Sequence, residues 1–273
     1  MNGIANLTAE KQIIAGICRQ KGDMIRFILV ALAVVLFLIL SIPVLVFEWL
    51  LGKRNPAARD RQCQKIVRAM FRLILFFTGT ELIVEGAEHI PDRAVLFVGN
   101  HRSYFDIVTS YTVMRRKTGY IAKKEMEKIP LLKQWMQNIG CLFLNRQDVR
   151  EGLKTILQAI ADIKAGTSLV IYPEGTRNRN ENGYELLEFK EGSLKIAEKA
   201  RCPVIPMAEL GSANIFEKHL PKMYRARVVL RFGEPIDLRA LPEEYKKKPG
   251  MYVEETIRAM LEQMRQEHPE IEM

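Results

Sequence analysis

The chain has 273 residues, of which 48% are hydrophobic and 27% charged, and this length allows one large α/β domain plus an appendage. The formal net charge of +9 favours an anionic partner: nucleic acid, a membrane surface, or an acidic protein or substrate. The four cysteines (Cys18, Cys63, Cys141 and Cys202) occur singly, which excludes paired zinc and redox motifs and favours a reducing compartment.

Residues 27–47 contain no charged side chain, and their length suits a helix that spans a bilayer. Pro43 can kink or break such a helix, so a segment that enters one leaflet and returns is an alternative to a full span. A long apolar stretch without a small-residue cleavage site argues against a removable signal peptide. Basic residues are denser after the segment than before it. The positive-inside rule therefore places the rest of the chain on the cytoplasmic side of a cell membrane.

A second amphipathic stretch covers residues 64–78, where Lys65, Arg68 and Arg72 recur at helical spacing among apolar residues. This pattern is typical of a basic helix at a lipid interface. The alternative is a core helix whose cations extend to solvent. Gly79 is suited to end the helix. We therefore predict a membrane-associated helical region over residues 1–80 and an α/β domain over residues 81–273.

Strand-like and helix-like segments alternate from residue 81 onward, which predicts an α/β fold with a mixed, largely parallel sheet flanked by helices. The predicted strands are 82–84, 94–98, 120–122, 141–144, 168–172, 204–207 and 226–232. The predicted helices are 103–116, 131–137, 149–165, 192–200 and 254–267. The third helix is capped by Asp148, and its apolar side is formed by Val149, Leu153, Ile156, Leu157, Ile160 and Ile163.

The stretch over residues 94–106 carries the clearest chemical signal. An apolar strand ends at the turn Gly99-Asn100, His101 follows, and Ser103 with Asp106 forms an S-x-x-D helix start in which Ser103 is the N-cap. This geometry folds His101 back beside the Asp106 carboxylate. The carboxylate could keep one imidazole nitrogen protonated and leave the other free as a base. The alternative is that Asp106 is only a capping acid and His101 only a loop histidine.

Polar and charged residues follow four successive predicted strands: Asn100 and His101, Lys123 and Lys124, Asn145 and Arg146, and the run Glu174, Gly175, Thr176 and Arg177. Ligands of open α/β sheets bind at the carboxyl ends of the strands. A histidine–aspartate pair at one such end and cations at three others predict a site for an anionic substrate. Arginine forks suit a phosphate and lysine offers a point charge, although each cation taken singly could be a surface charge.

These stretches, taken together, resemble the motifs of the glycerolipid acyltransferases, specifically the 1-acylglycerol-3-phosphate acyltransferase family. Its catalytic motif resembles Asn100-His101-Arg102-Ser103-x-x-Asp106. The second, third and fourth blocks resemble Gly-Cys-Leu-Phe-Leu-Asn-Arg at 140–146, Tyr-Pro-Glu-Gly-Thr-Arg at 172–177 and Cys-Pro-Val-Ile-Pro at 202–206. Departures from the family pattern are Asn145 for a frequent aspartate, Tyr172 for phenylalanine and Asn178 for serine. The resemblance covers about residues 82–210.

The resemblance implies a membrane acyltransferase in which His101 takes the proton from the 2-hydroxyl of lysophosphatidic acid and Asp106 orients the imidazole. The donor would be a thioester of CoA or of acyl carrier protein, and no further cofactor, metal or nucleic acid is implied. The partners would be membrane lipid, lysophosphatidic acid and the thioester. The fourth block would line the acyl channel, and Glu174 would fix Arg177 or a loop amide. Substrate binding would fall to Lys123, Asn145, Arg146, Glu174, Gly175, Thr176 and Arg177.

Alternatives include the same chemistry on glycerol-3-phosphate, a lysophospholipid or an amino-acid lipid. A non-catalytic protein that binds anionic lipid would not need the His101–Asp106 pair. A thioesterase would have to admit water where Arg146 and Arg177 are expected to hold a phosphate. Ser103 as a covalent nucleophile is disfavoured, because its hydroxyl is expected to cap the helix.

Overall fold

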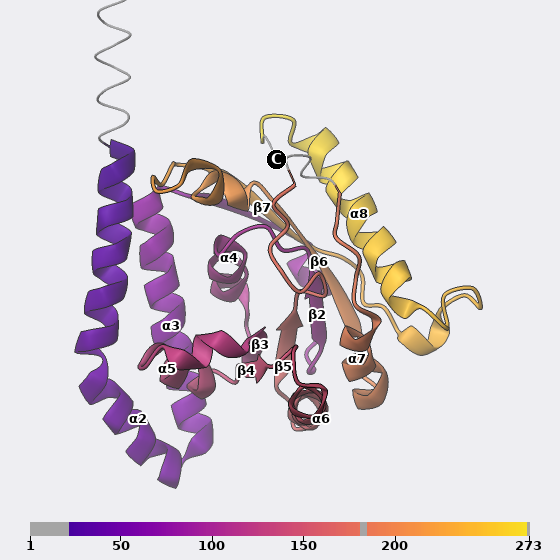
Figure 1. The fold of residues 1–273 in the computed structure, drawn as a ribbon, viewed down its shortest axis with the longest axis horizontal. Coiled ribbons are helices and arrows are strands. Elements are labelled where there is room, and N and C mark those ends of the chain that lie inside the picture. Colours follow the sequence, from indigo (N-terminus) through magenta and orange to yellow (C-terminus); the bar gives the residue numbers. More distant parts are fainter. Residues whose placement is uncertain (1–21, 181–184, 272–273) are drawn as a thin grey trace, which may run out of the picture.

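The computed structural model describes residues 22–180 and 185–271. At its centre is a seven-stranded sheet with the order β1-β7-β6-β2-β5-β3-β4 (Figure 1). Neighbouring strands are parallel except β6 and β7, which pair antiparallel. The predicted mixed, largely parallel sheet is thus confirmed. The strands are β1 (Glu81–Glu85), β2 (Leu96–Gly99), β3 (Thr118–Lys123), β4 (Leu142–Leu144), β5 (Ser168–Ile171), β6 (Val204–Leu210) and β7 (Arg227–Phe232).

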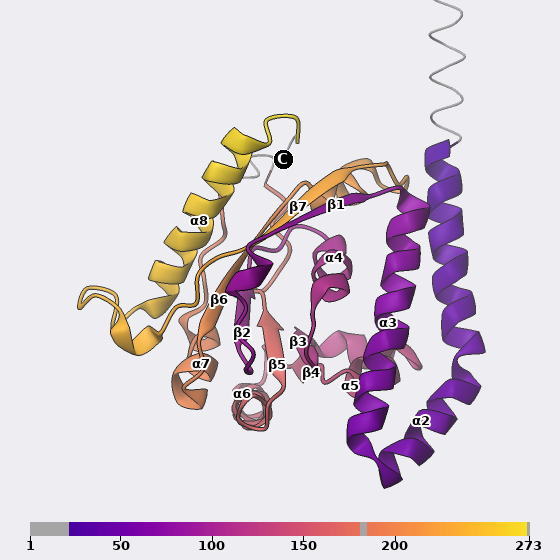
Figure 2. The same cartoon turned by 180° about the vertical axis from the view of Figure 1, so that it is seen from behind.

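Both faces of the sheet are covered by helices, as predicted. Along β2 and the residue before it, Leu96 and Val98 belong to one buried cluster, whereas Val95 and Phe97 belong to another, because successive side chains of a strand point to opposite faces. A strand that is buried on both faces needs apolar residues throughout, which explains its unbroken apolar run. Helices α3, α4 and α5 cover one face, and α6, α7 and α8 cover the other (Figures 1 and 2).

The helix boundaries differ from the predicted ones at a few ends. Helix α4 stops at Val113 because Met114 takes extended backbone angles. Residues Glu191–Ser193 form a 3₁₀ turn before α7, and α8 starts earlier than predicted, with Pro249 in its first turn. The helices that cover the sheet are α3 (Pro56–Thr78), α4 (Phe105–Val113), α5 (Leu132–Asn138), α6 (Val149–Lys164), α7 (Lys195–Ala200) and α8 (Pro249–Glu267).

The predicted apolar side of α6 is buried only in part. Ile156 packs against the core cluster and Ile163 is 4% exposed. The helix contacts the sheet and α7 along one stripe, and apolar residues on successive turns beside that stripe stay in solvent. These exposed residues are Val149 (85%), Leu153 (58%) and Leu157 (57%).

The predicted membrane segment is not one continuous helix. A first helix, Gly22–Leu40, ends before Ser41, and α2 (Ile42–Arg54) leaves in another direction (Figure 1). Pro43 has no N–H to donate and its ring crowds the preceding turn, which accounts for the break. Trp135 of α5 donates its indole N–H to the Ser41 hydroxyl at 2.8 Å, so the bend is fastened to the α/β fold.

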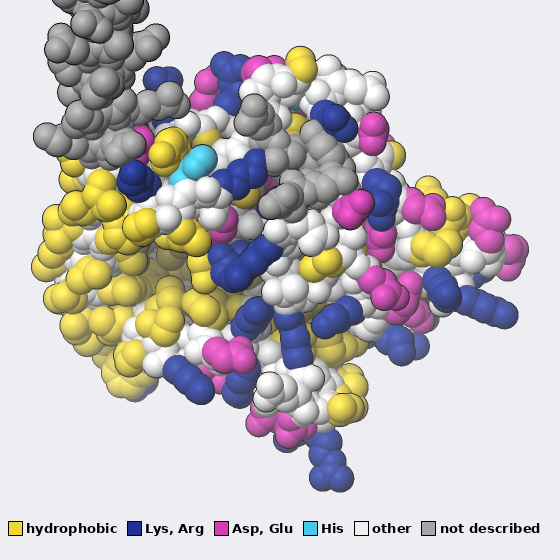
Figure 3. Space-filling model, turned by 45° about the horizontal axis from the view of Figure 1, so that its top comes forward, with side chains coloured by type: hydrophobic (Ala, Val, Ile, Leu, Met, Phe, Trp, Pro, Cys, Tyr) yellow, Lys and Arg dark blue, Asp and Glu magenta, His cyan; other side chains and the backbone are white. Residues whose placement is uncertain are grey.

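Within the described residues, the first helix is the one segment long and apolar enough to cross a membrane, and 11% of its apolar window is buried. Figure 3 shows hydrophobic side chains gathered on the side of the molecule where the N-terminal helices lie. The largest exposed apolar residues of this surface are Ile25, Ile28, Leu32, Val35, Ile39, Leu40, Val46, Phe47 and Trp49.

The predicted interfacial helix is the second half of α3, and one side of it packs against the α/β fold. Val67 is 5% exposed in the cluster beneath the sheet. Arg68 donates to the carbonyl of Met114, so this cation is bound to protein. Lys65 and Arg72 are exposed. Leu73 (41%) and Phe76 (77%) are exposed on the same helix, so the contact of this helix with lipid stays a prediction.

Candidate active site

The strand ends singled out from the sequence meet at one edge of the sheet. Strands β2, β5, β3 and β4 are adjacent and parallel, so their carboxyl ends lie together. A cavity of about 280 Å³ at this edge is lined by five of the nine predicted site residues: His101, Lys123, Arg146, Gly175 and Arg177. The topology thus assembles residues that are far apart in the chain into one site.

The His101 imidazole is hydrogen-bonded to the Asp106 carboxylate, with Nδ1 at 2.7 Å from Oδ2. The same oxygen accepts the backbone N–H groups of Arg102 at 2.7 Å and Ser103 at 2.9 Å. Because an ionised carboxylate only accepts hydrogen bonds, Nδ1 carries the proton, and in a neutral imidazole Nε2 then has a free lone pair. The predicted contact between His101 and Asp106 is confirmed.

The start of α4 differs in one detail from the prediction. Tyr104 is the N-cap, so Ser103 lies one residue before the cap. The Ser103 hydroxyl still accepts the N–H of Phe105 at 2.9 Å, and it donates to Glu217 at 2.6 Å. Asp106 falls in the first turn, where the helix dipole favours a carboxylate. The serine hydroxyl is therefore engaged in the helix start.

Glu174 lies behind the His101 loop and does not line the cavity. Its Oε1 accepts the backbone N–H of His101 at 2.7 Å, and its Oε2 accepts that of Leu187 at 3.0 Å. Glu174 was predicted to fix either Arg177 or a loop amide, and in the structure it binds loop amides. The acid that pairs with Arg177 is a different residue. Burial raises the pKa of Glu174 to about 7, although the two N–H donors oppose this shift.

The wall of the cavity is mostly apolar. The ring of Tyr172 stacks on the His101 imidazole, with centroids 4.3 Å apart and planes inclined by 14°. Side chains from α3, α4, α5 and the residue that follows α5 provide much of the remaining surface: Phe71, Ile107, Tyr111, Leu132, Met136 and Ile139. A cavity of this kind, with few polar groups beside a basic nitrogen, suits a hydrocarbon chain attached to a reactive centre.

Two neighbours hold the guanidinium of Arg177. Nη1 donates to Glu217 Oε1 at 3.0 Å, and the guanidinium carbon lies 3.7 Å from the centre of the Tyr104 ring. The same Oε1 accepts the backbone N–H of Tyr104 at 2.8 Å. Glu217 was not predicted from the sequence, because it lies in the 3₁₀ helix η5 (Glu217–His219), outside all four motif blocks.

Besides Glu174, two predicted substrate-binding residues do not line this cavity. The Asn145 side chain accepts the N–H of Gln147 at 3.0 Å, donates to Glu151 at 2.8 Å, and borders a neighbouring cavity. Thr176 is exposed and lines neither cavity. The fourth block, expected along the acyl channel, enters β6 in the middle of the sheet and lines neither cavity.

Comparisons with known proteins identify the family. A protein-family profile described as Acyltransferase matches residues 81–209. The "Probable 1-acyl-sn-glycerol-3-phosphate acyltransferase" of Mycoplasma pneumoniae is 30% identical over 235 residues, which cover 81% of this chain and 85% of that protein. The chain belongs to the 1-acyl-sn-glycerol-3-phosphate acyltransferase family. It is therefore an acyltransferase, an enzyme of lipid metabolism.

One further relative agrees with this assignment, and a solved structure shares the fold. The 1-acyl-sn-glycerol-3-phosphate acyltransferase of Helicobacter pylori is 30% identical over 212 residues, covering 77% of this chain and 83% of that protein. The fold is shared with the crystal structure of the 1-acyl-sn-glycerophosphate (LPA) acyltransferase PlsC from Thermotoga maritima. That structure has a TM-score of 0.77 and 24% identity, with 90% of this chain and 98% of that chain covered.

The acyltransferase also has a buried carboxylate next to the His101 loop that the sequence analysis missed. Glu209 of β6 is 2% exposed, and its Oε1 accepts the hydroxyl of Thr109 at 2.7 Å. Its backbone N–H and C=O bind the side chain of Asn100 at 2.8 and 2.9 Å. Burial and, next, the charge of Asp106 raise the pKa of Glu209 well above its ordinary value. The β6 backbone thereby fixes the residue before His101.

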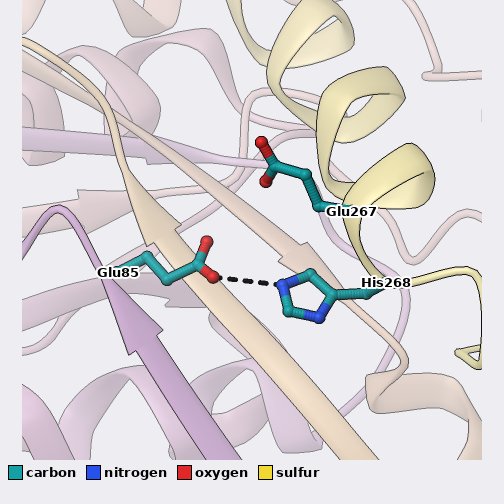
Figure 4. A group of neighbouring side chains, drawn as sticks. All are labelled: Glu85, Glu267 and His268. Carbon is teal, nitrogen blue, oxygen red and sulfur yellow. Dashed lines mark hydrogen bonds and ion pairs between the residues drawn. The ribbon is translucent and has the colours of Figure 1, made fainter.

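A second cluster of titratable groups lies at the C-terminal end of α8. Glu85, Glu267 and His268 point toward one another, and His268 Nε2 is 3.1 Å from Glu85 (Figure 4). Three such ligands could hold a metal ion, but Arg231 binds both carboxylates, at 2.6 Å in the case of Glu85. The cluster is best explained as an ion-pair network that ties α8 to β1 and β7.

Proposed function

We propose that this acyltransferase transfers an acyl group from an acyl thioester to the 2-hydroxyl of 1-acylglycerol-3-phosphate, giving phosphatidic acid. The names of the Mycoplasma pneumoniae and Helicobacter pylori relatives support this acceptor. The observation that carries the proposal is the single cavity in which a histidine base, three cations and an apolar wall meet. An acceptor with a phosphate, a free hydroxyl and an acyl chain needs all three.

In the proposed reaction, Nε2 of His101 takes the proton of the 2-hydroxyl as its oxygen attacks the thioester carbonyl carbon. The new C–O bond forms, the C–S bond breaks, and the leaving thiolate takes the proton back from the imidazolium. Asp106 keeps Nδ1 protonated and stabilises the imidazolium that forms in between. These steps use the thioester as co-substrate and require no further cofactor.

The acceptor phosphate is proposed to lie among Lys123, Arg146 and Arg177, all of which line the cavity. The Glu217 carboxylate and the Tyr104 ring hold the Arg177 guanidinium in place before substrate binds. A charge positioned in advance loses little energy to reorganisation when the anion arrives. The apolar wall is proposed to hold an acyl chain.

The enzyme is proposed to work at a cell membrane, with its α/β domain on the cytoplasmic side. The exposed apolar surface of the first helix and α2 supports membrane attachment, because side chains of this size are rarely left in water over such an area. Lys53 and Arg54, in the last turn of α2, support the cytoplasmic placement, because basic residues that flank a membrane segment favour the cytoplasmic side. The division into a membrane region over 1–80 and a catalytic domain over 81–273 remains a proposal.

The test is a matrix of donors and acceptors on membranes that contain the full-length protein, with products identified by mass spectrometry. Acyl-CoA and acyl carrier protein thioesters are each offered with 1-acylglycerol-3-phosphate, glycerol-3-phosphate, a lysophospholipid and a monoacylglycerol. We expect phosphatidic acid as the main product. Equal rates with the phosphorylated acceptor and the neutral monoacylglycerol would contradict the proposed phosphate site.

A further inference from the structure

The exposed face of α6 is unlike an ordinary solvated helix surface. Val149, Leu153 and Leu157 lie one helical turn apart and are all more than half exposed. Their spacing places them on one side of the helix. The buried side is formed by other residues, such as Ala159 and Ile163. An uncovered apolar stripe on a surface helix marks a site of interaction.

Cations lie along one side of this stripe, whereas the acids of α6 lie elsewhere. At about 100° per residue, Arg150, Lys154 and Lys164 fall beside the apolar stripe, and Glu151 and Asp162 fall on the far side of the helix. The three cations are exposed, and within the described part of the chain their side chains have no hydrogen-bond or ion-pair partner.

The acids of α6 are already engaged within the chain. Glu151 accepts from Asn145 at 2.8 Å, and Asp162 accepts from Gln158 at 2.8 Å. Asp148 at the start of the helix binds two backbone N–H groups. The α6 face therefore presents apolar and positively charged groups together, which complement an acidic amphipathic surface.

The same end of α6 borders a second cavity, of about 310 Å³, which is lined among others by Val149 and Lys190. Four residues line both this cavity and the one that contains His101: Ile121, Arg146, Tyr172 and Gly175. The two cavities thus share part of their wall.

Two cations meet at that shared wall. A Cβ placed on Gly175 would lie 3.0 Å from Lys190 Nζ and 3.1 Å from Arg146 Nη1, so the absence of a side chain leaves room for both. Within the described residues neither cation has a hydrogen-bond or ion-pair partner. A phosphate-bearing chain that entered beside Val149 would meet these cations on its way toward His101.

We propose that the α6 face, defined by Val149, Leu153, Leu157, Arg150, Lys154 and Lys164, docks an acyl carrier protein. The phosphopantetheine arm of that acidic protein enters the second cavity and presents its thioester to His101. This inference rests on the proposed function and adds the donor's docking surface to it. A lipid surface is the less favoured occupant, because α6 covers the sheet face opposite to α3 and the N-terminal helices (Figures 1 and 2).

The test compares two donors that carry the same acyl chain, acyl carrier protein and CoA, on the full-length protein in detergent micelles. The variant Leu153→Ser/Lys154→Glu removes one apolar group and reverses one charge of the α6 face. We expect the KM for the acyl carrier protein thioester to rise about 10-fold or more, and the KM for acyl-CoA to change less than about twofold. Salt should weaken the use of the carrier protein by the wild type more than by the variant.

The matched control is Met251→Ser/Lys247→Glu on and before α8, which makes the same chemical changes at exposed residues away from both cavities. It should leave both KM values unchanged. Unchanged carrier-protein kinetics in the α6 variant, or an equal loss with both donors, would overturn the docking proposal. Loss of binding to anionic vesicles without a change in carrier-protein KM would assign the face to lipid instead, and would also overturn it.

A binding measurement separates this proposal from the proposed function. Fluorescently labelled acyl carrier protein should bind the wild type and the α8 control with equal affinity, and the α6 variant about 10-fold more weakly. If no donor supports transfer but this difference in binding is present, the proposed function fails and the docking surface stands. If acyl-CoA supports transfer and the carrier protein does not bind, the docking surface fails and the proposed function stands.

Discussion

Arg177 and Glu217 form an ion pair of 3.0 Å across 40 positions of the sequence. The Glu217 carboxylate also binds the Ser103 hydroxyl at 2.6 Å and the Tyr104 N–H at 2.8 Å, both at the start of α4. One carboxylate therefore fixes the cation proposed to bind phosphate and the helix start that carries Asp106. The two halves of the proposed chemistry, phosphate binding and proton transfer, are mechanically linked through Glu217.

Loss of this pair should weaken binding of the phosphorylated acceptor. Arg177→Ala should raise the KM for 1-acylglycerol-3-phosphate about 10-fold to 100-fold, because a charge-assisted hydrogen bond is lost. Glu217→Gln should raise it less, about threefold to 10-fold, since Arg177 remains but loses its ionic partner. Steady-state kinetics on the acceptor, with donor hydrolysis measured in parallel, check this. Arg179→Ala at a nearby exposed position is the control, and equal damage to donor hydrolysis by Arg177→Ala would argue against the assignment.

The His101–Asp106 pair should control the chemical step. His101→Ala should lower kcat about 100-fold to 10,000-fold, because a positioned general base is removed. Asp106→Asn should also lower it steeply, since an amide can hold the imidazole in the wrong tautomer. His89→Ala, at a histidine outside the cavity, serves as control. Single-turnover acyl transfer measures the effect, and a His101→Ala enzyme that kept a tenth of wild-type turnover would rule out the mechanism.

Glu174 should make the stability of the fold depend on pH. Burial raises its pKa from 4.5 to about 7, so between these values the folded state binds more protons than the unfolded chain. The stability associated with Glu174 is fully present below pH 4.5 and is lost as pH rises to about 7. The free energy of unfolding falls by about 3 kcal/mol over this range, because one pKa unit corresponds to about 1.36 kcal/mol.

The comparison with Glu174→Gln isolates this effect. We measure the difference in stability between the wild type and the variant by thermal unfolding in detergent. This difference should favour the wild type more at pH 5 than at pH 7.5. Glu188→Gln, at an exposed position of the same loop, should keep the wild-type pH dependence. Parallel pH profiles for the wild type and Glu174→Gln would show that the buried carboxyl does not titrate in this range.

Membrane attachment should depend mainly on apolar contact. The first helix and α2 expose large apolar side chains, whereas α3 offers Lys65 and Arg72 but has committed Arg68 to the Met114 carbonyl. The full-length protein should therefore stay in the membrane pellet at high salt and be released by detergent, because salt screens charges but does not weaken apolar burial. Lys65→Gln/Arg72→Gln should sediment like the wild type. Release by salt alone would show that charge holds the protein on the membrane.

Local sequence determined much of the fold and the central pair of the site. The alternation of apolar strands and amphipathic helices predicted the largely parallel sheet, because each strand buried on both faces must be apolar throughout. The spacing from His101 to Asp106 placed the two side chains together, because a turn followed by a helix start fixes their geometry within six residues. Each of the four successive strands delivered a polar residue to the shared cavity, namely His101, Lys123, Arg146 and Arg177, since parallel strands end at one edge.

Tertiary structure alone decided how the remaining side chains are used. Arg177 is paired with Glu217 and Glu174 with loop amides, and neither choice follows from the motif around residue 174. Leu153 fits the apolar pattern of α6 yet stays in solvent, and Arg68 fits a lipid-facing pattern yet binds a carbonyl of the chain. Helical periodicity tells which side chains share a face. What covers that face depends on how distant segments of the chain pack, and no local pattern contains that information.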